Sequence, residues 1–578
     1  MDLVSIIMRD KEKEYRRIRL LSTGVIVAVI ILLSRVYYVQ IVQGDIFSNK
    51  ADHQYANPAQ EIFDRGSIFF STKSGTVASG ATLKSGFTVA INPKLIADPE
   101  SLYLAINKTI PIDKELFLAK AQKTSDPYEE VARQVDETVG KALSAQKIKG
   151  VIFQKEQWRY YPSKNLAAHT LGFLGFKDNT LAGRYGLERY YEDTLERTNE
   201  TVYVNFFAEI FANLKKTVVE KKRLEGDLVT TIEPTVQSFI EKKIDQIQNQ
   251  WRSKKVGAIV MNPKNGAIYA LAVTPTFDPN KFKYEKNVAV FSNPIVEDVY
   301  EMGSIIKPLT MAAGLDAKVI TPKTTYEDTG FIELDGKKIS NYDGKARGTT
   351  SMQEVLNQSL NLGVSFVVKK LGRDRFAEYM RNFGLGERSG IDLPNESIGL
   401  IKNLTSRRDV EYATASFGQG IALSPVATAR ALSALGNGGF LITPHIVKQI
   451  KYKIGVTDDV TPPVGRQVIA TSTSAQITEM LVTVVDKALL GGKIKMPHYS
   501  IAAKTGTAQI AKSEGGGYDE GRFLHSFFGY LPASDPQFLV FMYHLEPQGV
   551  QYASQTLTEP FSDIAKFLIS YYQVPPDR

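Results

Sequence analysis

The feature that most constrains this chain is a proline just after a serine and a lysine, in the stretch from 300 to 308. Pro308 has no backbone N–H to donate, so a helix accommodates it best in its first turn, where the N–H groups lack partners anyway. The apolar residues that follow continue the helix, which therefore begins close to Ser304. Lys307 then lies one turn above Ser304 on the same helical face. The sequence thus places a nucleophile beside a candidate base.

A serine attacks a carbonyl carbon only when a base removes its proton. No suitable histidine lies nearby in the sequence, so Lys307 is the available base. A free lysine, with a pKa of about 10.4, is too basic for this task. Lowering its pKa to about 7 to 8 costs about 4 kcal/mol, which must come from burial and from a neighbouring positive charge. Ile305 and Ile306 provide apolar surroundings, and a second lysine would supply the charge.

Two further polar motifs follow along the chain. Ser359-Leu360-Asn361 lies in an apolar helical stretch, and Lys504-Thr505-Gly506-Thr507 lies in a segment suited to a β-strand. Taken singly, each motif is more often part of an ordinary helix or strand. Together, in this order and at spacings that one domain can fold around, they match the set found in penicillin-binding proteins and class A β-lactamases.

With these motifs the chain resembles the class B penicillin-binding proteins, and the resemblance covers most of its length. Other positions that match the family's pattern are 251–282, 383–386, 390–394, 418–420, 65–66, 161–162, His169 and 186–188. The chain departs from that pattern in three places. Met302 stands where the family usually has proline, Glu233 replaces an aspartate, and the Asp-Arg pair expected shortly after Arg65-Gly66 is absent.

The predicted fold class is α+β. Strand patterns at 256–261, 267–273, 526–531 and 538–543, with helical patterns at 235–251 and 559–572, predict one antiparallel sheet covered by helices. The resemblance implies that this is a serine penicillin-recognising transpeptidase fold on an elongated α+β pedestal. We expect the non-catalytic pedestal, of the dimerisation type, over 43–226 and the transpeptidase domain over 227–578.

The N-terminal region has the pattern of a membrane anchor. Residues 20–34 are uncharged and strongly apolar, and Arg16, Arg17 and Arg19 precede them. Extended to 42, a helix would be about 34 Å long, enough for a hydrocarbon core of about 30 Å. Because the basic cluster favours the cytoplasm, we expect a cytoplasmic tail over 1–19, a single transmembrane helix over 20–42 and a catalytic domain outside the bacterial cell membrane. A cleaved signal peptide is the alternative, but no small-x-small site follows the apolar run.

Composition excludes several other chemistries. The chain has no cysteine, which rules out thiol catalysis, disulfides and cysteine-bound zinc. The six histidines show no paired metal-ligand spacing, so we expect no metal and no cofactor. The net charge of +8 is typical of dispersed solubilising charge, and with no nucleic-acid motif we expect no nucleic-acid partner. His169, alone in an apolar helical stretch, is predicted to be structural.

The resemblance implies a peptidoglycan D,D-transpeptidase that cross-links stem peptides through a serine acyl-enzyme, releases D-alanine and is acylated by β-lactams. It implies catalytic roles for Ser304, Lys307, Ser359, Asn361 and Lys504, and substrate-binding roles for Thr505, Gly506 and Thr507. In this scheme Ser304 is the nucleophile, Lys307 its base and Ser359 the proton relay to the leaving amine.

The remaining positions would hold the substrate. Asn361 would bind its peptide amide, Lys504 would supply positive charge, and Thr505 and Thr507 would bind its terminal carboxylate. The backbone N–H groups of Ser304 and Thr507 would form the oxyanion hole. A side chain at position 506 would crowd a substrate lying along the strand edge.

Two alternatives stay open. One is a D,D-carboxypeptidase or β-lactamase-like hydrolase, although class A β-lactamases need a deacylating glutamate after the Ser-x-Asn motif, and Glu354 precedes it. The other is a non-catalytic penicillin-binding scaffold or sensor. The family also implies membrane partners, a SEDS-type glycan polymerase and other proteins of the divisome or elongasome. The stretch from 359 to 363 favours the division type over the elongation type.

Overall fold

The computed structural model describes residue 32 and residues 63–177, 180–197, 225–512 and 517–578. The chain divides into two compact units, Met1–Phe63 and Asp64–Arg578. Apart from Leu32, the transmembrane helix expected at 20–42 lies outside the described residues. Among the helices that are described, none combines the length and the apolar character needed to cross a membrane.

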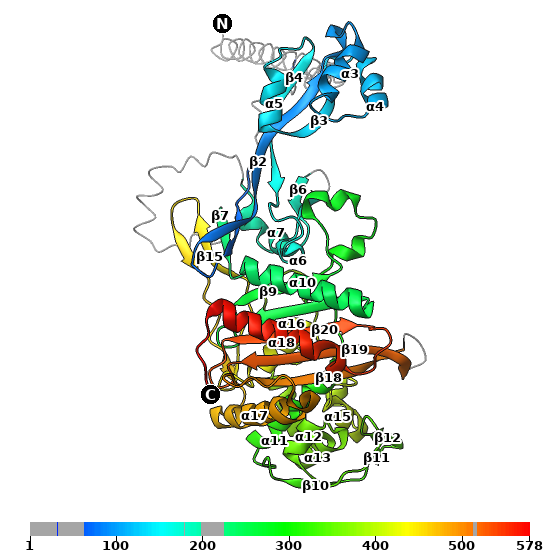
Figure 1. Ribbon diagram of the computed structural model, residues 1–578, viewed down its shortest axis with the longest axis vertical. Coiled ribbons are helices and arrows are strands. Elements are labelled where there is room, and N and C mark those ends of the chain that lie inside the picture. Colours follow the sequence, from blue (N-terminus) through cyan, green and yellow to red (C-terminus); the bar gives the residue numbers. More distant parts are fainter. Residues whose placement is uncertain (1–31, 33–62, 178–179, 198–224, 513–516) are drawn as a thin grey trace, which may run out of the picture. The chain divides into compact units, whose positions relative to one another are not determined.

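A five-stranded antiparallel sheet organises the part of the chain that carries the three motifs (Figure 1), with the strand order β18-β19-β20-β8-β9. Its strands are β8 (Lys255–Met261), β9 (Ile268–Thr274), β18 (Ala502–Ala511), β19 (Tyr518–Leu531) and β20 (Phe538–Leu545). All four pairings are antiparallel. The predicted antiparallel sheet is therefore confirmed, and β18, which carries the Lys-Thr-Gly-Thr motif, is one of its edges.

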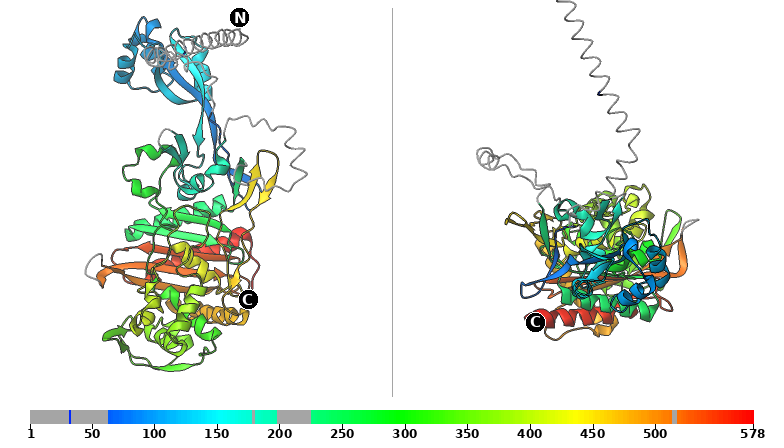
Figure 2. Two further views of the ribbon diagram at one scale, coloured as in Figure 1. Left: turned by 180° about the vertical axis from the view of Figure 1, so that it is seen from behind. Right: turned by 90° about the horizontal axis from the view of Figure 1, so that it is seen from above.

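Both faces of this sheet are covered by helices (Figure 1; Figure 2). Along β20, Phe538, Val540 and Met542 pack in one core with α10 (Pro234–Trp251) and α18 (Ala553–Tyr572). The alternate residues of β20 face the other core, which includes α11 (Lys307–Asp316) and α16 (Pro425–Ser433). This alternation of period two is what a strand buried on both faces requires, because successive side chains point to opposite sides.

A second, seven-stranded sheet joins the two halves of the chain. Its order is β16-β15-β7-β1-β2-β3, with β4 paired to β2. The strands are β1 (Ile68–Ser71), β2 (Val77–Ile91), β3 (Glu129–Asp136), β4 (Val151–Tyr160), β7 (Gly226–Thr230), β15 (Val447–Tyr452) and β16 (Thr457–Asp459). Strand β7 pairs with β1 on one side and with β15 on the other. Backbone hydrogen bonds therefore cross the region where the sequence suggested a domain boundary.

A separate small core lies in the first part of the chain. It contains Val89, Ile106, Phe117 and Leu143, from β2 and from the helices α3 (Pro99–Asn107), α4 (Lys114–Ala121) and α5 (Glu137–Ser144). Two short helices, α7 (Gly186–Tyr190) and α8 (Glu192–Leu195), follow in the same part.

Further helices and short strands complete the part of the chain that contains the five-stranded sheet. They are η6 (Gly303–Ile306), β10 (Thr325–Asp328), β11 (Phe331–Leu334), β12 (Lys337–Ser340), β13 (Gly348–Ser351), α12 (Met352–Asn357), α13 (Asn361–Leu371), α14 (Arg373–Asn382), α15 (Asp409–Ala415) and α17 (Thr471–Thr483). Among them, η6 and α17 pack against β18.

Candidate active site

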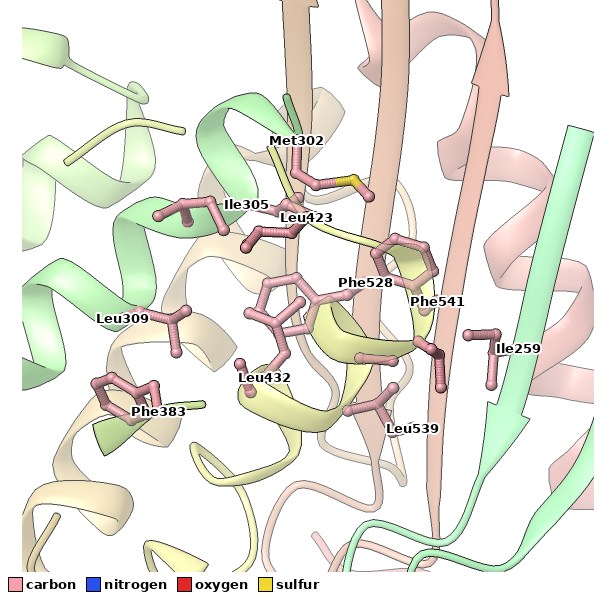
Figure 3. Packing of buried hydrophobic residues seen from close by; sticks show 14 of the residues in the cluster. Ile259, Met302, Ile305, Leu309, Phe383, Leu423, Leu432, Phe528, Leu539 and Phe541 are labelled. Atoms are coloured by element: carbon pink, nitrogen blue, oxygen red, sulfur yellow. The ribbon is translucent and has the colours of Figure 1, made fainter. Parts of the chain in front are cut away.

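Ser304 lies on the short 3-10 turn η6, which runs directly into α11. Pro308 occupies the first turn of α11, as its missing N–H predicts. Just before the turn, Met302 is 1 % exposed and belongs to the same buried core as Ile305, Leu423 and Phe541 (Figure 3). Core packing thus holds the position where the family usually has proline.

Two glycines let the serine turn approach strand β18 closely. Gly303 has a φ of +65°, in the left-handed region that glycine tolerates. A Cβ on Gly506 would lie 2.4 Å from Ser526 Oγ and 2.7 Å from the Met302 carbonyl oxygen. The same Ser526 hydroxyl donates to that carbonyl at 2.8 Å. Gly506 is therefore needed to seat the turn itself, a reason different from the substrate clearance expected from sequence.

Two lysines converge on Ser359. Lys307 donates from Nζ to the Ser359 carbonyl oxygen and lies 3.2 Å from the Ser359 hydroxyl. Lys504 Nζ lies 2.9 Å from the same hydroxyl. Ser359 adopts a φ of +56°, unusual for a residue with a side chain. The three sequence motifs therefore meet here, although the hydrogen bonds of Lys307 go to Ser359 and not to Ser304.

The environment of both lysines opposes a positive charge. Lys307 is 0 % exposed and Lys504 is 3 % exposed. Burial, together with the charge of Lys504, lowers the pKa of Lys307 well below its ordinary value. Burial also lowers the pKa of Lys504 to about 7. Among the described residues both lysines donate to hydroxyl and carbonyl oxygens, so the pocket suits an anionic ligand.

Asn361 begins helix α13, two residues after Ser359. Its side-chain Nδ2 donates to the Ser340 carbonyl oxygen at 2.9 Å, which orients the amide. Asn341 Oδ1 accepts from the backbone N–H groups of Asn361 and Leu362 at 3.1 and 3.3 Å. Asn341 thus caps the helix, a role that sequence reasoning missed because its position in a turn carries no mark of it.

Thr505 and Thr507 lie half-buried on strand β18. Thr507 Oγ1 accepts a hydrogen bond of 3.0 Å from the backbone N–H of Ala553, at the start of α18. Because this oxygen already accepts an N–H, the Thr507 hydroxyl proton is free to point toward a ligand.

Glu301 is a second residue that sequence reasoning missed. Its carboxylate accepts from the Gly420 backbone N–H and from the Tyr518 hydroxyl, each at 3.0 Å. Burial raises the pKa of Glu301. This side chain ties the serine turn to the Gly418–Gly420 loop and to the start of β19. The glutamate's nearness to Ser304 in sequence was the only available signal.

His169 has structural contacts, as its sequence context predicts. It is 5 % exposed, its Nε2 donates to the Val290 carbonyl oxygen at 2.8 Å, and its ring packs edge-on against Phe277. Burial lowers its pKa to about 4.

The fold and the three converging motifs define a serine penicillin-recognising transpeptidase. The family model for the penicillin-binding protein transpeptidase domain matches residues 256–566, and that for the penicillin-binding protein dimerisation domain matches residues 64–231. The chain therefore belongs to the penicillin-binding proteins, and within them to class B.

Curated relatives span nearly the whole chain. Stage V sporulation protein D of Bacillus subtilis is 31 % identical over 561 residues, which cover 94 % of this chain and 84 % of that protein. Peptidoglycan D,D-transpeptidase MrdA of Acinetobacter baumannii is 26 % identical, over 92 % of this chain and 85 % of the relative.

Solved structures show the same fold. Penicillin-binding protein 2X of Streptococcus thermophilus aligns with a TM-score of 0.72 and 19 % identity, over 89 % of this chain and 81 % of that one. Penicillin-binding protein 3 of Mycobacterium tuberculosis, complexed with ampicillin, aligns with a TM-score of 0.67 and 21 % identity, over 89 % and 97 %.

Proposed function

We propose that this protein is a peptidoglycan D,D-transpeptidase that works through a serine acyl-enzyme and is a target of β-lactams. The observation that carries the proposal is the meeting of two buried, uncompensated lysines at Ser359, beside the turn that presents Ser304. Such a pair supplies a neutral amine to act as base and a positive charge to bind an anion.

In the acylation step, Ser304 Oγ attacks the carbonyl carbon of the penultimate D-alanine, and its proton passes to neutral Lys307. Burial and the charge of Lys504 lower the pKa of Lys307, which favours the neutral amine that a base requires. Ser359, bonded to both lysines, relays a proton to the departing nitrogen as the peptide bond breaks and D-alanine leaves. An amine of a neighbouring stem peptide then attacks the acyl carbonyl carbon and forms the new amide bond. As the ester bond to Ser304 Oγ breaks, the proton lost by the amine goes to that oxygen, which restores the serine hydroxyl.

Binding of the terminal carboxylate falls to Lys504, Thr505 and Thr507. A unit charge pair 4 Å apart at an effective dielectric constant of 20 attracts with about 4 kcal/mol. The oxyanion hole, formed by the N–H groups of Ser304 and Thr507, contributes on a similar scale, since losing one such donor typically costs about 3 to 4 kcal/mol. The dipole of α11 adds about 0.3 to 1 kcal/mol at an exposed site and is secondary.

We further propose the organisation that the sequence predicts: a cytoplasmic tail over 1–19, a membrane helix over 20–42, a pedestal over 43–226 and the transpeptidase domain over 227–578. The catalytic domain would lie outside the bacterial cell membrane, where its stem-peptide substrate is. A SEDS-type glycan polymerase is the expected membrane partner. The sporulation and MrdA relatives are as compatible with other wall-building roles as with division.

A fluorescent penicillin tests the proposal. It should label the full-length protein in detergent, and Ser304→Ala should abolish labelling while Ser292→Ala, a serine outside the three motifs, keeps it. Equal labelling of wild type and Ser304→Ala would refute the assignment. Rapid release of the label would favour a β-lactamase-like hydrolase. The scaffold alternative is tested in cells that depend on the gene, where growth with Ser304→Ala as the only copy would favour it.

A further inference from the structure

Two buried histidines lie on the two strands that follow Thr507 across the sheet, His525 on β19 and His544 on β20. His525 stands opposite Thr507 in the β18–β19 pairing, and His544 stands opposite His525 in the β19–β20 pairing. Both are 0 % exposed. Thr556, on α18 and 2 % exposed, places its Oγ1 2.9 Å from His525 Nδ1 and 2.9 Å from His544 Nε2. The threonine hydroxyl therefore bridges the two rings.

One arrangement of protons satisfies these contacts with both rings neutral. His525 Nε2 lies 2.9 Å from the Gln551 carbonyl oxygen, which can only accept, so Nε2 carries the proton and Nδ1 accepts from the Thr556 hydroxyl. Thr556 Oγ1 in turn accepts from His544 Nε2. His544 Nδ1 is then left to accept from the Ser253 hydroxyl at 2.8 Å.

Burial favours this neutral state. It lowers the pKa of His525 to about 4 and the pKa of His544 well below its ordinary value. Every ring nitrogen of the two histidines has a partner. A buried polar network whose members are all satisfied fixes the positions of the groups that it joins.

The network ends at the segment that contacts Thr507. His525 holds the carbonyl of Gln551, and two residues later the N–H of Ala553 donates to Thr507 Oγ1 at 3.0 Å. This N–H occupies an acceptor site of the Thr507 oxygen and leaves its proton available for a ligand. The direction of the Thr507 hydroxyl therefore depends on where residues 551–553 are held.

We infer that Ser253, His544, Thr556 and His525, here called the histidine network, position the Thr507 hydroxyl as a donor and thereby set the preference of the site for ligands that carry a carboxylate. The inference rests on the proposed function, in which Thr507 binds that carboxylate. All four residues are at most 5 % exposed. They act through Thr507 and are positioning residues.

The test uses Thr556→Val, which keeps the side-chain shape and removes the bridging hydroxyl. The full-length protein in detergent is acylated with benzylpenicillin and with its uncharged methyl ester, and the ratio of the two second-order rate constants is measured. Because a hydrogen bond to a charged group is lost, the ratio should fall about tenfold, with the ester rate nearly unchanged. An unchanged ratio, or an equal fall in both rate constants, would overturn the inference.

Thr558→Val is the matched control. Thr558 lies on the same helix, is 0 % exposed, and its hydroxyl is buried without a hydrogen-bond partner. Its replacement makes the same chemical change on the same helix but breaks no hydrogen bond of the network, so the ratio should stay at the wild-type value. A fall equal to that of Thr556→Val would show that the ratio reports general disturbance of α18, against the inference.

Two further variants keep the test decisive if Thr556→Val folds poorly. His525→Gln retains an N–H that can reach the Gln551 carbonyl, whereas His525→Leu does not, so the first should keep more of the carboxylate preference; equal preference in both would count against the network. In a Thr507→Val background, Thr556→Val should have no additional effect on the ratio. Failure of the wild type to be acylated at all would instead count against the proposed function.

Discussion

In the described part of this chain, two sites bury a pair of cations, and the two sites differ in whether carboxylates compensate the positive charges. In the first part of the chain, Arg65 and Arg159 both bond to the Glu188 carboxylate, at 2.8 and 2.6 Å. Arg65 also bonds to Glu192 at 2.8 Å. In the catalytic part, Lys307 and Lys504 share the hydroxyl of Ser359 and have no carboxylate between them.

The pKa values follow this difference. Burial alone would lower the pKa of Arg65, but the charges of Glu188 and Glu192 raise it. Burial alone would raise the pKa of Glu188, but Arg159 and Arg65 lower it. At the lysines nothing opposes burial, and both pKa values fall. A compensated cluster fixes structure, whereas an uncompensated one costs stability and supplies a base and an anion site.

The largest expected effect comes from removing the negative charge of Glu188, which compensates the charges of Arg65 and Arg159. Glu188→Gln leaves two buried guanidinium groups around an uncharged amide, and breaking a buried ion pair in this way typically costs about 3 to 5 kcal/mol of unfolding free energy. Denaturant unfolding of the full-length protein measures the loss. Glu192→Gln, at a side chain that is 25 % exposed, should cost clearly less. Equal, small losses in both variants would show that the cluster does not depend on its central charge.

Removing a charge from the lysine pair should instead raise the free energy of unfolding. Lys504→Met removes a buried charge that has no counter-ion, so we expect stability at pH 7 to rise by about 1 to 4 kcal/mol while acylation by β-lactams collapses. The pKa of Lys504 falls from 10.5 to about 7 on folding. Between these values the unfolded chain binds more protons, and wild-type stability therefore increases with pH.

Lys504→Met lacks the buried amine that causes this pH dependence. The excess of its free energy of unfolding over that of the wild type should therefore be largest at or below pH 7 and shrink toward pH 10.5. Unfolding curves of both proteins across this range measure the difference directly. A variant less stable than the wild type at pH 7 would mean that the hydrogen bonds of Lys504 outweigh the cost of burying its charge.

Much of the catalytic framework was predictable because it follows from local rules. Pro308 has no N–H, and the start of α11 follows from that alone. The short, continuous apolar run at 538–543 predicted a strand, and β20 is one. The need of Lys307 for a second lysine predicted that the Lys-Thr-Gly-Thr motif must come close, and Lys504 reaches the same hydroxyl.

The rest depends on contacts between distant segments. Ser526 bonds to the Met302 carbonyl across the sheet, and nothing in a strand serine announces such a partner. Gly506 was attributed to substrate clearance because the approach of the serine turn is a tertiary feature. The pairing of β7 with β15 was equally hidden, since strand partners far apart in sequence are set by the packed fold.

The smallest expected effect is a shift in the pH dependence of acylation, and it tests whether the two lysines act on each other. Acylation needs neutral Lys307, so the rate should fall at acid pH as this amine is protonated. Burial is the main cause of its lowered pKa and the charge of Lys504 is the second. Lys504, with a pKa of about 7, carries its charge throughout the acid range. In Lys504→Met that repulsion is gone, so the pKa of Lys307 should rise and the fall in residual acylation should begin at higher pH than in the wild type. Lys504→Arg keeps the charge, so its acylation rate should fall at the same acid pH as that of the wild type. If acylation falls at the same acid pH in the Met and Arg variants, burial alone lowers the pKa of Lys307, and the two lysines do not affect each other.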